Sequence, residues 1–295
     1  RVASLEPRLR QLADQFIDAF ATDGHADFVA QFARPYPMKV IGSLLNLPEE
    51  DLPHLHHLMN DLTTILFDDV DAEQQLVLMK SYIELEQYMQ DLVEERRRNP
   101  RDDIASDLLK AVDAGQVPLS VLEASDLLCR VLEAGVETTV NFLGNCLIKL
   151  LSEPGYWQAL VEKPDSISAV VEEMLRLDPP GFCTFRQTTQ EVELGGKRIP
   201  EGAVIQALLT SANHDEAVFA AADAYDPQRE KVNRHLAFGY GIHFCLGAPL
   251  ARLESRIALE HLSQRLPTLR LVPGQQINYT PNMVIHGVNQ LLIEW

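Results

Sequence analysis

The sequence contains no apolar run close to the roughly 18 residues that a membrane-spanning helix needs, so we predict no membrane span. It is also poor in basic residues: 25 Lys and Arg stand against 43 Asp and Glu, which gives a formal net charge of −18. Because binding to phosphates requires clustered Lys and Arg, this balance argues against a nucleic-acid partner. Mutual repulsion at this charge favours a monomer.

Cysteine is scarce as well, and none of the four cysteines has the C-x-x-C spacing of a redox or zinc motif. No signal peptide is visible, although the chain begins at Arg1 rather than Met. We therefore expect free thiols and a cytoplasmic location. No internal repeat or low-complexity linker interrupts the sequence, so we predict one domain over residues 1–295.

The hydrophobic pattern predicts a mainly α fold with a minor β portion. The longest predicted helix runs from Ser120 to Ser152 and is apolar on more than one side, as a central buried helix is. Strands are expected around the Gly195-Gly196 turn signal and in short segments near the C-terminus. Other predicted helices cover residues 71–98, 168–177 and 249–265, and predicted strands include 185–199, the region of 271, the pair 284–285, and 291–293.

The most informative stretch is FGYGIHFCLG, from Phe238 to Gly247. Its glycines permit backbone turns that other residues avoid, and they let the loop press against a flat partner. Cys245 stands just before a predicted helix, whose first backbone amides can donate to a thiolate. Such a loop presents a single sulfur ligand. A buried cysteine in a glycine-rich turn is the alternative for the cysteine taken alone.

The full pattern F-G-x-G-x-H-x-C-x-G resembles the haem-binding signature of the cytochromes P450, and the resemblance extends along the whole chain. It implies a cytochrome P450 fold that carries haem b, with Cys245 as the ligand to the iron and Phe238, Gly239 and Gly247 shaping the haem loop. Relative to this family, about 100 residues before Arg1 are absent, so we expect the N-terminal part of the fold to be missing.

Glu173 and Arg176 form an E-x-x-R motif, one turn apart on a predicted helix, where their side chains can pair. A solvated pair is the ordinary interpretation of this spacing. By resemblance, the motif is the buried E-x-x-R of the family, and Arg229 takes the place of the arginine that completes its network. The resemblance implies a structural role for all three residues, bracing the proximal side of the haem.

The segment from Ala134 to Thr139 (AGVETT) lies midway along the long predicted helix. Gly135 weakens the helix, and the Thr138 hydroxyl can bond to the backbone four residues earlier and open the turn. The resemblance places Ala134 and Gly135 beside the haem. It also implies that the acid–alcohol pair, Glu137 and Thr138, is catalytic and delivers protons to dioxygen.

Two further residues are assigned to the haem carboxylates by resemblance. Arg186 and His243 match the positions that bind the propionates, and cationic or donor groups suit that role. A surface arginine is the alternative for Arg186 considered by itself.

The soluble, acidic character and several local stretches are similar to the bacterial, camphor-hydroxylase-like branch of the family. This resemblance implies a small, largely apolar, terpenoid-like substrate, dioxygen, and electrons from an iron–sulfur ferredoxin. The ferredoxin would in turn be supplied by an NAD(P)H reductase. The particular substrate, the position hydroxylated and the particular ferredoxin are not encoded in any motif.

Pocket residues are also predicted from matched family positions: Ala134, Phe182, Thr184, Val284 and Ile285. Core packing is the alternative for the aliphatic pair.

Arg130 departs from the family pattern, because it stands one turn before Ala134 where an apolar residue is usual. It either anchors a polar or carboxylate-bearing substrate or pairs with Glu133 on a wet face.

Two other functions compete with monooxygenation. A thiolate-haem peroxygenase would use hydrogen peroxide and need no redox partner, whereas the Glu137–Thr138 pair favours reductive activation of dioxygen. A haem-dependent sensor or binding protein would keep Cys245 and the E-x-x-R motif but would not need that pair.

Overall fold

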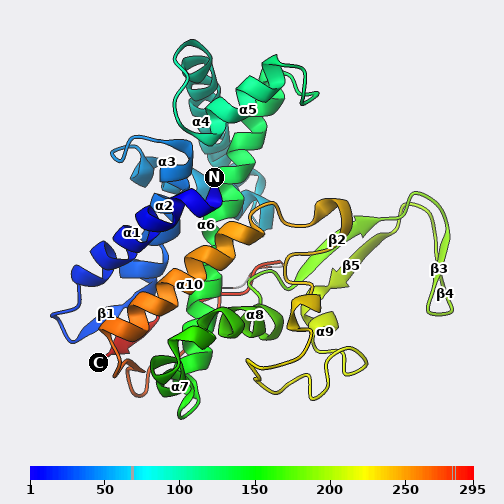
Figure 1. Ribbon diagram of the computed structural model, residues 1–295. Coiled ribbons are helices and arrows are strands. Elements are labelled where there is room, and N and C mark those ends of the chain that lie inside the picture. Colours follow the sequence, from blue (N-terminus) through cyan, green and yellow to red (C-terminus); the bar gives the residue numbers. More distant parts are fainter. Residues whose placement is uncertain (68–69, 281, 283) are drawn as a thin grey trace.

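The computed structural model describes residues 1–295 apart from 68, 69, 281 and 283. Helix α6 (Val121–Ser152) passes through the middle of the molecule, and most of the other α-helices pack against it (Figure 1). Ser120 caps its N-terminus, and a reciprocal bond from the Ser120 amide to Glu123 completes a capping box. Residues such as Leu128, Leu132 and Leu147 are fully buried around it, as the apolar pattern predicts.

The N-terminal third of the chain forms a helical group on one side of α6. Helix α4 begins after the capping residue Asp71 and ends at Arg98, which confirms the helix predicted over 71–98. It pairs with α3 and lies against α6. The helices of this group are α1 (Glu6–Asp18), α2 (Pro35–Leu45), α3 (Leu52–Phe67), α4 (Ala72–Arg98) and α5 (Ile104–Asp113).

The later helices cover another side of α6. Helix α10 runs alongside α1 and also contacts α8 (Figure 1). The bounds of these helices are α7 (Tyr156–Glu162), α8 (Ile167–Leu177), α9 (Leu209–Asn213) and α10 (Ala248–Arg265). Single turns of other helical types occur at Val2–Leu5, Val29–Ala33, Pro164–Ser166, Val232–Arg234 and Gly241–His243. Within the described residues, no helix is long and apolar enough to cross a membrane.

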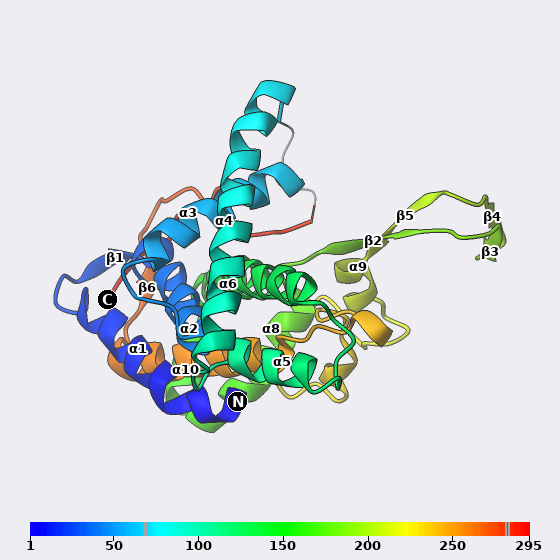
Figure 2. The same cartoon turned by 90° about the horizontal axis from the view of Figure 1, so that it is seen from above.

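The strands form small antiparallel sheets. In the first, β7 lies between β1 and β6. In the second, β2 pairs with β5 over its full length, and in the third β3 and β4 form a hairpin across Gly195 and Gly196. The second and third sheets form an arm that projects from the helical body (Figure 2). The strands are β1 (His25–Asp27), β2 (Cys183–Gln187), β3 (Val192–Leu194), β4 (Lys197–Ile199), β5 (Val204–Leu208), β6 (Arg270–Leu271) and β7 (Leu292–Glu294).

The strands predicted around the Gly195-Gly196 turn are confirmed, and both glycines have positive φ. Strand β5 was missed, because its partner β2 precedes it by a whole hairpin and no local turn marks the pairing. The strand expected at 284–285 is wrong: Ile285 makes only a single bridge to Gly181. Asn282 explains this, since its side-chain oxygen accepts from the amides of Val284 and Ile285 at 2.8 and 2.9 Å.

Candidate active site

The cysteine loop folds back on itself before helix α10 begins. The amide of Cys245 donates to the carbonyl of Phe238 at 2.9 Å, and Gly239 and Gly241 have φ of 71° and 75°. These angles strain any other residue, so the glycines set the path of the loop. A Cβ at Gly247 would lie 3.7 Å from the Cys245 sulfur, which is an ordinary van der Waals distance, so this glycine lies directly beside the sulfur. Cys245 is a half-buried free thiol.

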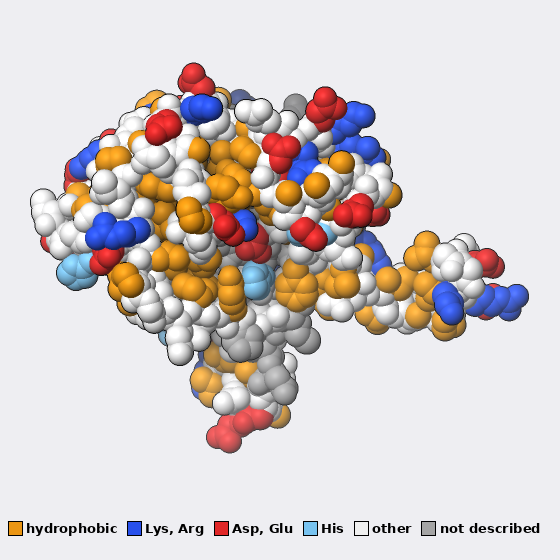
Figure 3. Space-filling model, turned by 90° about the horizontal axis from the view of Figure 1, so that it is seen from below, with side chains coloured by type: hydrophobic (Ala, Val, Ile, Leu, Met, Phe, Trp, Pro, Cys, Tyr) orange, Lys and Arg blue, Asp and Glu red, His pale blue; other side chains and the backbone are white. Residues whose placement is uncertain are grey.

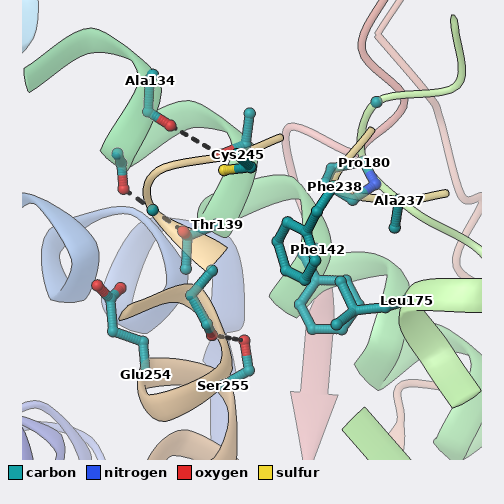
Figure 4. Close-up of a pocket in the computed structure, with 15 residues that line it drawn as sticks. Ala134, Thr139, Phe142, Leu175, Pro180, Ala237, Phe238, Cys245, Glu254 and Ser255 are labelled. Carbon is teal, nitrogen blue, oxygen red and sulfur yellow. Dashed lines mark hydrogen bonds between the residues drawn. The ribbon is translucent and has the colours of Figure 1, made fainter. Parts of the chain in front are cut away.

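A cavity of about 140 Å³ separates this loop from the middle of α6. Phe142, Leu175 and Phe238 gather on one side of it, and Glu254 lies on the other (Figure 4). Apolar walls of this kind exclude water and leave the sulfur as the reactive group of the loop side. Ala134, Gly135, Thr138, Phe238, Cys245 and Gly247, all predicted for the site, line it together.

On the helix side, the Thr138 hydroxyl donates to the carbonyl of Ala134 at 2.8 Å, as predicted. The predicted opening of the turn is wrong, because α6 is continuous from Val121 to Ser152. The hydroxyl adds a second donor to a carbonyl without interrupting the helix. Gly135 serves close packing as well: a Cβ there would come within 2.5 Å of the Ile41 side chain on α2.

A second hollow, of about 380 Å³, adjoins the first and shares Phe238 with it. It is lined by Thr184 and Arg186, which alternate along β2 and therefore face the same side, and by Gly239 and His243 of the cysteine loop. The Arg186 guanidinium donates to the Thr184 hydroxyl at 2.9 Å and to the Phe185 carbonyl at 2.7 Å. Among the described residues, no carboxylate pairs with Arg186.

Glu173 and Arg176 on α8 are fully buried and form a two-pronged ion pair, with both bonds at 2.8 Å. Arg229 adds a bond to the same carboxylate at 3.1 Å. The two arginines also donate to the carbonyls of Asn213 and of residues 220–224, in the irregular segment that leads to the cysteine loop. The network therefore fastens this segment to α8.

A neighbouring network centred on Glu172 was not predictable from local sequence patterns. Its carboxylate accepts from Arg252 of α10 at 3.1 Å and lies 3.2 Å from the His235 ring. Burial by itself would raise the pKa of Glu172, but the hydrogen bonds from His235 and Arg252 outweigh it and lower the pKa to about 2. The Arg252 guanidinium also lies 4.5 Å from the centre of the Phe238 ring, so this network supports the cysteine loop directly.

Glu137 and Thr138 are adjacent in sequence, but they line different cavities. Thr138 faces the apolar cavity, whereas Glu137 lines a separate polar pocket of about 210 Å³. The Glu137 carboxylate accepts from the Asn141 side chain at 2.9 Å, one turn further along α6. Ile285 lines the same polar pocket, and its bridge partner Gly181 lines the apolar cavity.

The remaining predicted pocket residues fall into two groups. Phe182 meets the 284–285 segment, because its amide donates to the Val284 carbonyl at 3.0 Å. Arg130 instead pairs with Glu133 at 3.4 Å and Asp126 at 3.6 Å, and its guanidinium lies 5.9 Å from the centre of the Tyr82 ring. Since Arg130 is neutralised on its own helix and does not line the apolar cavity, its geometry favours the ion-pair interpretation.

A predominantly α protein that holds one cysteine in a glycine-bounded loop, opposite a threonine on its central helix, has the architecture of a haem-thiolate enzyme. The family model for cytochrome P450 matches residues 3–288. The chain belongs to the cytochrome P450 family, and it is a monooxygenase oxidoreductase.

The relatives of this chain are longer than the chain itself. The mycinamicin IV hydroxylase/epoxidase of Micromonospora griseorubida is 38% identical, over 100% of this chain and 74% of the relative. The vitamin D(3) 25-hydroxylase of Pseudonocardia autotrophica is 35% identical, over 99% and 71%. Among solved structures, cytochrome P450 CYP109Q5 from Chondromyces apiculatus matches with a TM-score of 0.90 and 37% identity, over 99% of this chain and 72% of that one.

Haem b is the cofactor of this family, and the residues present fit it. A planar group with two carboxylates needs an apolar slot, a free axial sulfur and cationic or donor groups at one edge. The apolar cavity supplies the slot and Cys245 the sulfur. The adjoining hollow supplies Arg186, which has no acidic partner within the described chain, together with His243. Phe238 lines both the apolar cavity and the adjoining hollow, so the slot and the donor groups are neighbours.

Proposed function

We propose that this chain hydroxylates a small, largely apolar, terpenoid-like substrate according to R–H + O₂ + 2e⁻ + 2H⁺ → R–OH + H₂O. The electrons come from NAD(P)H through a reductase and an iron–sulfur ferredoxin, and the enzyme works as a cytoplasmic monomer. One observation carries the proposal: Cys245 and Thr138 line the same apolar cavity from opposite elements.

In this proposal the bound haem supplies the oxidising chemistry. Cys245 would be its protein ligand, and the anionic sulfur would supply electron density to the bound group. Arg186 and His243 hold the two propionates, while Gly239 and Gly247 give the loop its close approach. Glu173, Arg176 and Arg229 keep the segment before the loop in place, which is a positioning role.

Glu137 and Thr138 share the delivery of protons. Glu137 collects a proton in the polar pocket, where water reaches it, and Thr138 presents a hydroxyl inside the apolar cavity. The bond from Thr138 to the Ala134 carbonyl holds that hydroxyl in one orientation. A proton that passes from the Glu137 carboxyl to the Thr138 hydroxyl moves from the wet side to the dry side without admitting bulk water.

Substrate binding falls to the residues around the strand-like contact between 181–182 and 284–285. Phe182, Val284 and Ile285 offer apolar surface there, Ala134 leaves room beside the helix, and Thr184 adds a hydroxyl at the edge. A surface of this kind favours a largely apolar molecule. The hydroxylase names of two relatives, one of them for vitamin D(3), support a hydroxylation reaction.

The test is the absorption spectrum of the dithionite-reduced protein under carbon monoxide. A Soret band at about 450 nm is expected for a thiolate opposite carbon monoxide. Cys245→His should lose that band, whereas Cys129→Ala, which changes a buried thiol elsewhere on α6, should keep it. A Cys245→His variant that retains the band would disprove the ligand assignment.

Turnover separates the proposal from a peroxygenase or a non-catalytic haem protein. Hydroxylation of a terpenoid panel should require ferredoxin, reductase and NAD(P)H together. Equal product from hydrogen peroxide alone would identify a peroxygenase. Haem binding with no product under either condition would favour a sensor or binding protein.

A further inference from the structure

The polar pocket that contains Glu137 differs in composition from the apolar cavity beside it. Helix α3, helix α6, Arg34 and described residues of the C-terminal segment (Thr280, Asn282, Ile285, Gly287 and Asn289) enclose it. Its wall is made almost entirely of amide, hydroxyl and charged side chains, with Ile285 as the large apolar exception. The described residues that line it are Arg34, Asn60, Thr63, Thr64, Glu137, Asn141, Thr280, Asn282, Ile285, Gly287 and Asn289.

This pocket is a built feature of the fold. A Cβ at Gly287 would come within 1.7 Å of the Asn141 side-chain oxygen, so only glycine permits this approach of the C-terminal segment to α6. The Asn145 side chain holds the same segment by donating to the His286 carbonyl at 3.0 Å. Glu137 and Asn282 are already engaged by Asn141 and by backbone amides. Their positions are therefore fixed before any ligand arrives.

Arg34 supplies the positive charge of the pocket. Across the described residues, no carboxylate lies within ion-pair distance of its guanidinium, and no hydrogen bond from that side chain occurs. Arg130, by contrast, has Asp126 and Glu133 beside it. Arg34 is only partly exposed, at the junction of the polar pocket and a hollow that contains His56. Burial lowers the pKa of His56, and the charge of Arg34 lowers it further.

A half-buried guanidinium without an acid has lost part of its hydration and gained no ion pair in return. An incoming carboxylate or similar anion restores that loss, because guanidinium and carboxylate form paired, charge-assisted hydrogen bonds. The protein as a whole carries a formal net charge of −18, so general attraction does not bring an anion to this surface. Recognition must come from the pocket itself.

We infer that the polar pocket binds the carboxylate of an amphipathic carboxylic acid, with Arg34 as the residue that recognises it. The hydroxyls of Thr63 and Thr64 line the same pocket and supply further donors. Ile285 gives the same pocket a large apolar side chain, and the apolar part of the acid is placed against it. The position of the apolar part rests on the proposed function, whereas capture of the carboxylate by Arg34 does not.

Calorimetric titration of the haem-loaded protein with dodecanoic acid and with methyl dodecanoate tests this inference. The acid should bind more tightly than the ester. Arg34→Gln should weaken binding of the acid about tenfold or more and leave the ester unchanged, because a lost charge-assisted hydrogen bond has that magnitude. Arg34→Lys keeps the charge and should recover part of the affinity. Arg97→Gln, which removes an exposed arginine paired with Asp113, is the matched control and should bind as the parent does.

The inference fails if Arg34→Gln binds the acid within twofold of the parent protein, or if decanoic, dodecanoic and hexadecanoic acids all fail to bind. It also fails if acid and ester lose affinity equally, since that result indicates a change of pocket shape. Heat of binding does not depend on electron transfer or on proton delivery. A protein that binds the acid through Arg34 but gives no product with ferredoxin and NAD(P)H would therefore contradict the proposed function alone.

Discussion

Thr138 and Glu137 show how one residue step along a helix separates two environments. Successive side chains on an α-helix point about 100° apart, so one faces the apolar cavity and the other the polar pocket. A proton passing between the two therefore moves from a wet to a dry environment.

The first prediction concerns the hydroxyl of Thr138. Thr138→Ala should consume NAD(P)H at a comparable rate but release most of the electrons as hydrogen peroxide, because the apolar cavity loses its oriented hydroxyl. Peroxide formed per NAD(P)H measures this uncoupling. Thr138→Ser retains the hydroxyl and should remain largely coupled. If the alanine variant stays as coupled as the parent, Thr138 has no part in proton delivery.

The second prediction concerns Glu254, a fully buried acid on α10 that lines the apolar cavity. Burial raises its pKa well above the ordinary value of 4.5, so the folded protein keeps a proton that the unfolded chain releases. Stability therefore falls as pH rises above about 4.5. Glu254→Gln removes this linkage, and its free energy of unfolding should decline less between pH 5 and pH 8. Urea titrations at several pH values measure this free energy. If it declines equally with pH in both proteins, Glu254 is ionised when folded.

At the residue scale, motifs located the cysteine loop, the Glu173–Arg176 pair and the helix threonine. Local spacing carries that information, because each motif lies within ten residues. Glu172 and Arg34 escaped notice for the opposite reason. The partners of Glu172 are 63 and 80 residues away in sequence. The significance of Arg34 lies in the lack of an acid beside it, which only a folded chain reveals.

At the scale of elements, the Glu172 network ties α8 to α10 and to the segment before the cysteine loop. A carboxyl whose pKa is lowered to about 2 stabilises the fold at pH values above 4.5, and this contribution disappears as pH falls from 4.5 to 2. Glu172→Gln should therefore cost about 2 kcal/mol at pH 7. The difference in the free energy of unfolding between Glu172→Gln and the parent protein should become smaller as the pH is lowered. Denaturant titrations at several pH values measure this, and a difference that stays constant with pH would assign the cost to packing alone.

Elements with their own start and stop signals were predictable from sequence. Ser120 and Asp71 cap α6 and α4, and Gly195-Gly196 turns the β3–β4 hairpin. Strand β5 and the 280–289 segment lacked such signals. Strand β5 pairs with β2, which lies before the β3–β4 hairpin in the sequence. The C-terminal segment is positioned by the close contact between Gly287 and Asn141. Contacts of this kind are decided by packing between elements, which local patterns do not encode.

For the whole molecule, the cavity between α6 and the cysteine loop predicts a coupling between cofactor and stability. A ligand that binds only the folded state stabilises it by mass action. Removal of haem should therefore lower the melting temperature by at least about 5 °C. Calorimetry of the haem-loaded and haem-free proteins measures the difference. In Cys245→His, haem should raise the melting temperature by a smaller amount. Identical melting temperatures would mean that haem makes few contacts with the folded chain.

The β2–β5 arm has two free edges in the described chain. It projects from the helical body and presents apolar side chains along its length (Figure 3), among them Phe185, Val204 and Leu208, at 44%, 71% and 50% exposure. In the described chain its sheet has only two strands, so each has an edge with unpaired backbone groups. Such edges are templates for strand addition by another chain. In the described chain the arm can therefore accept a further strand, and an added lysine on β5 is the simplest way to block that pairing.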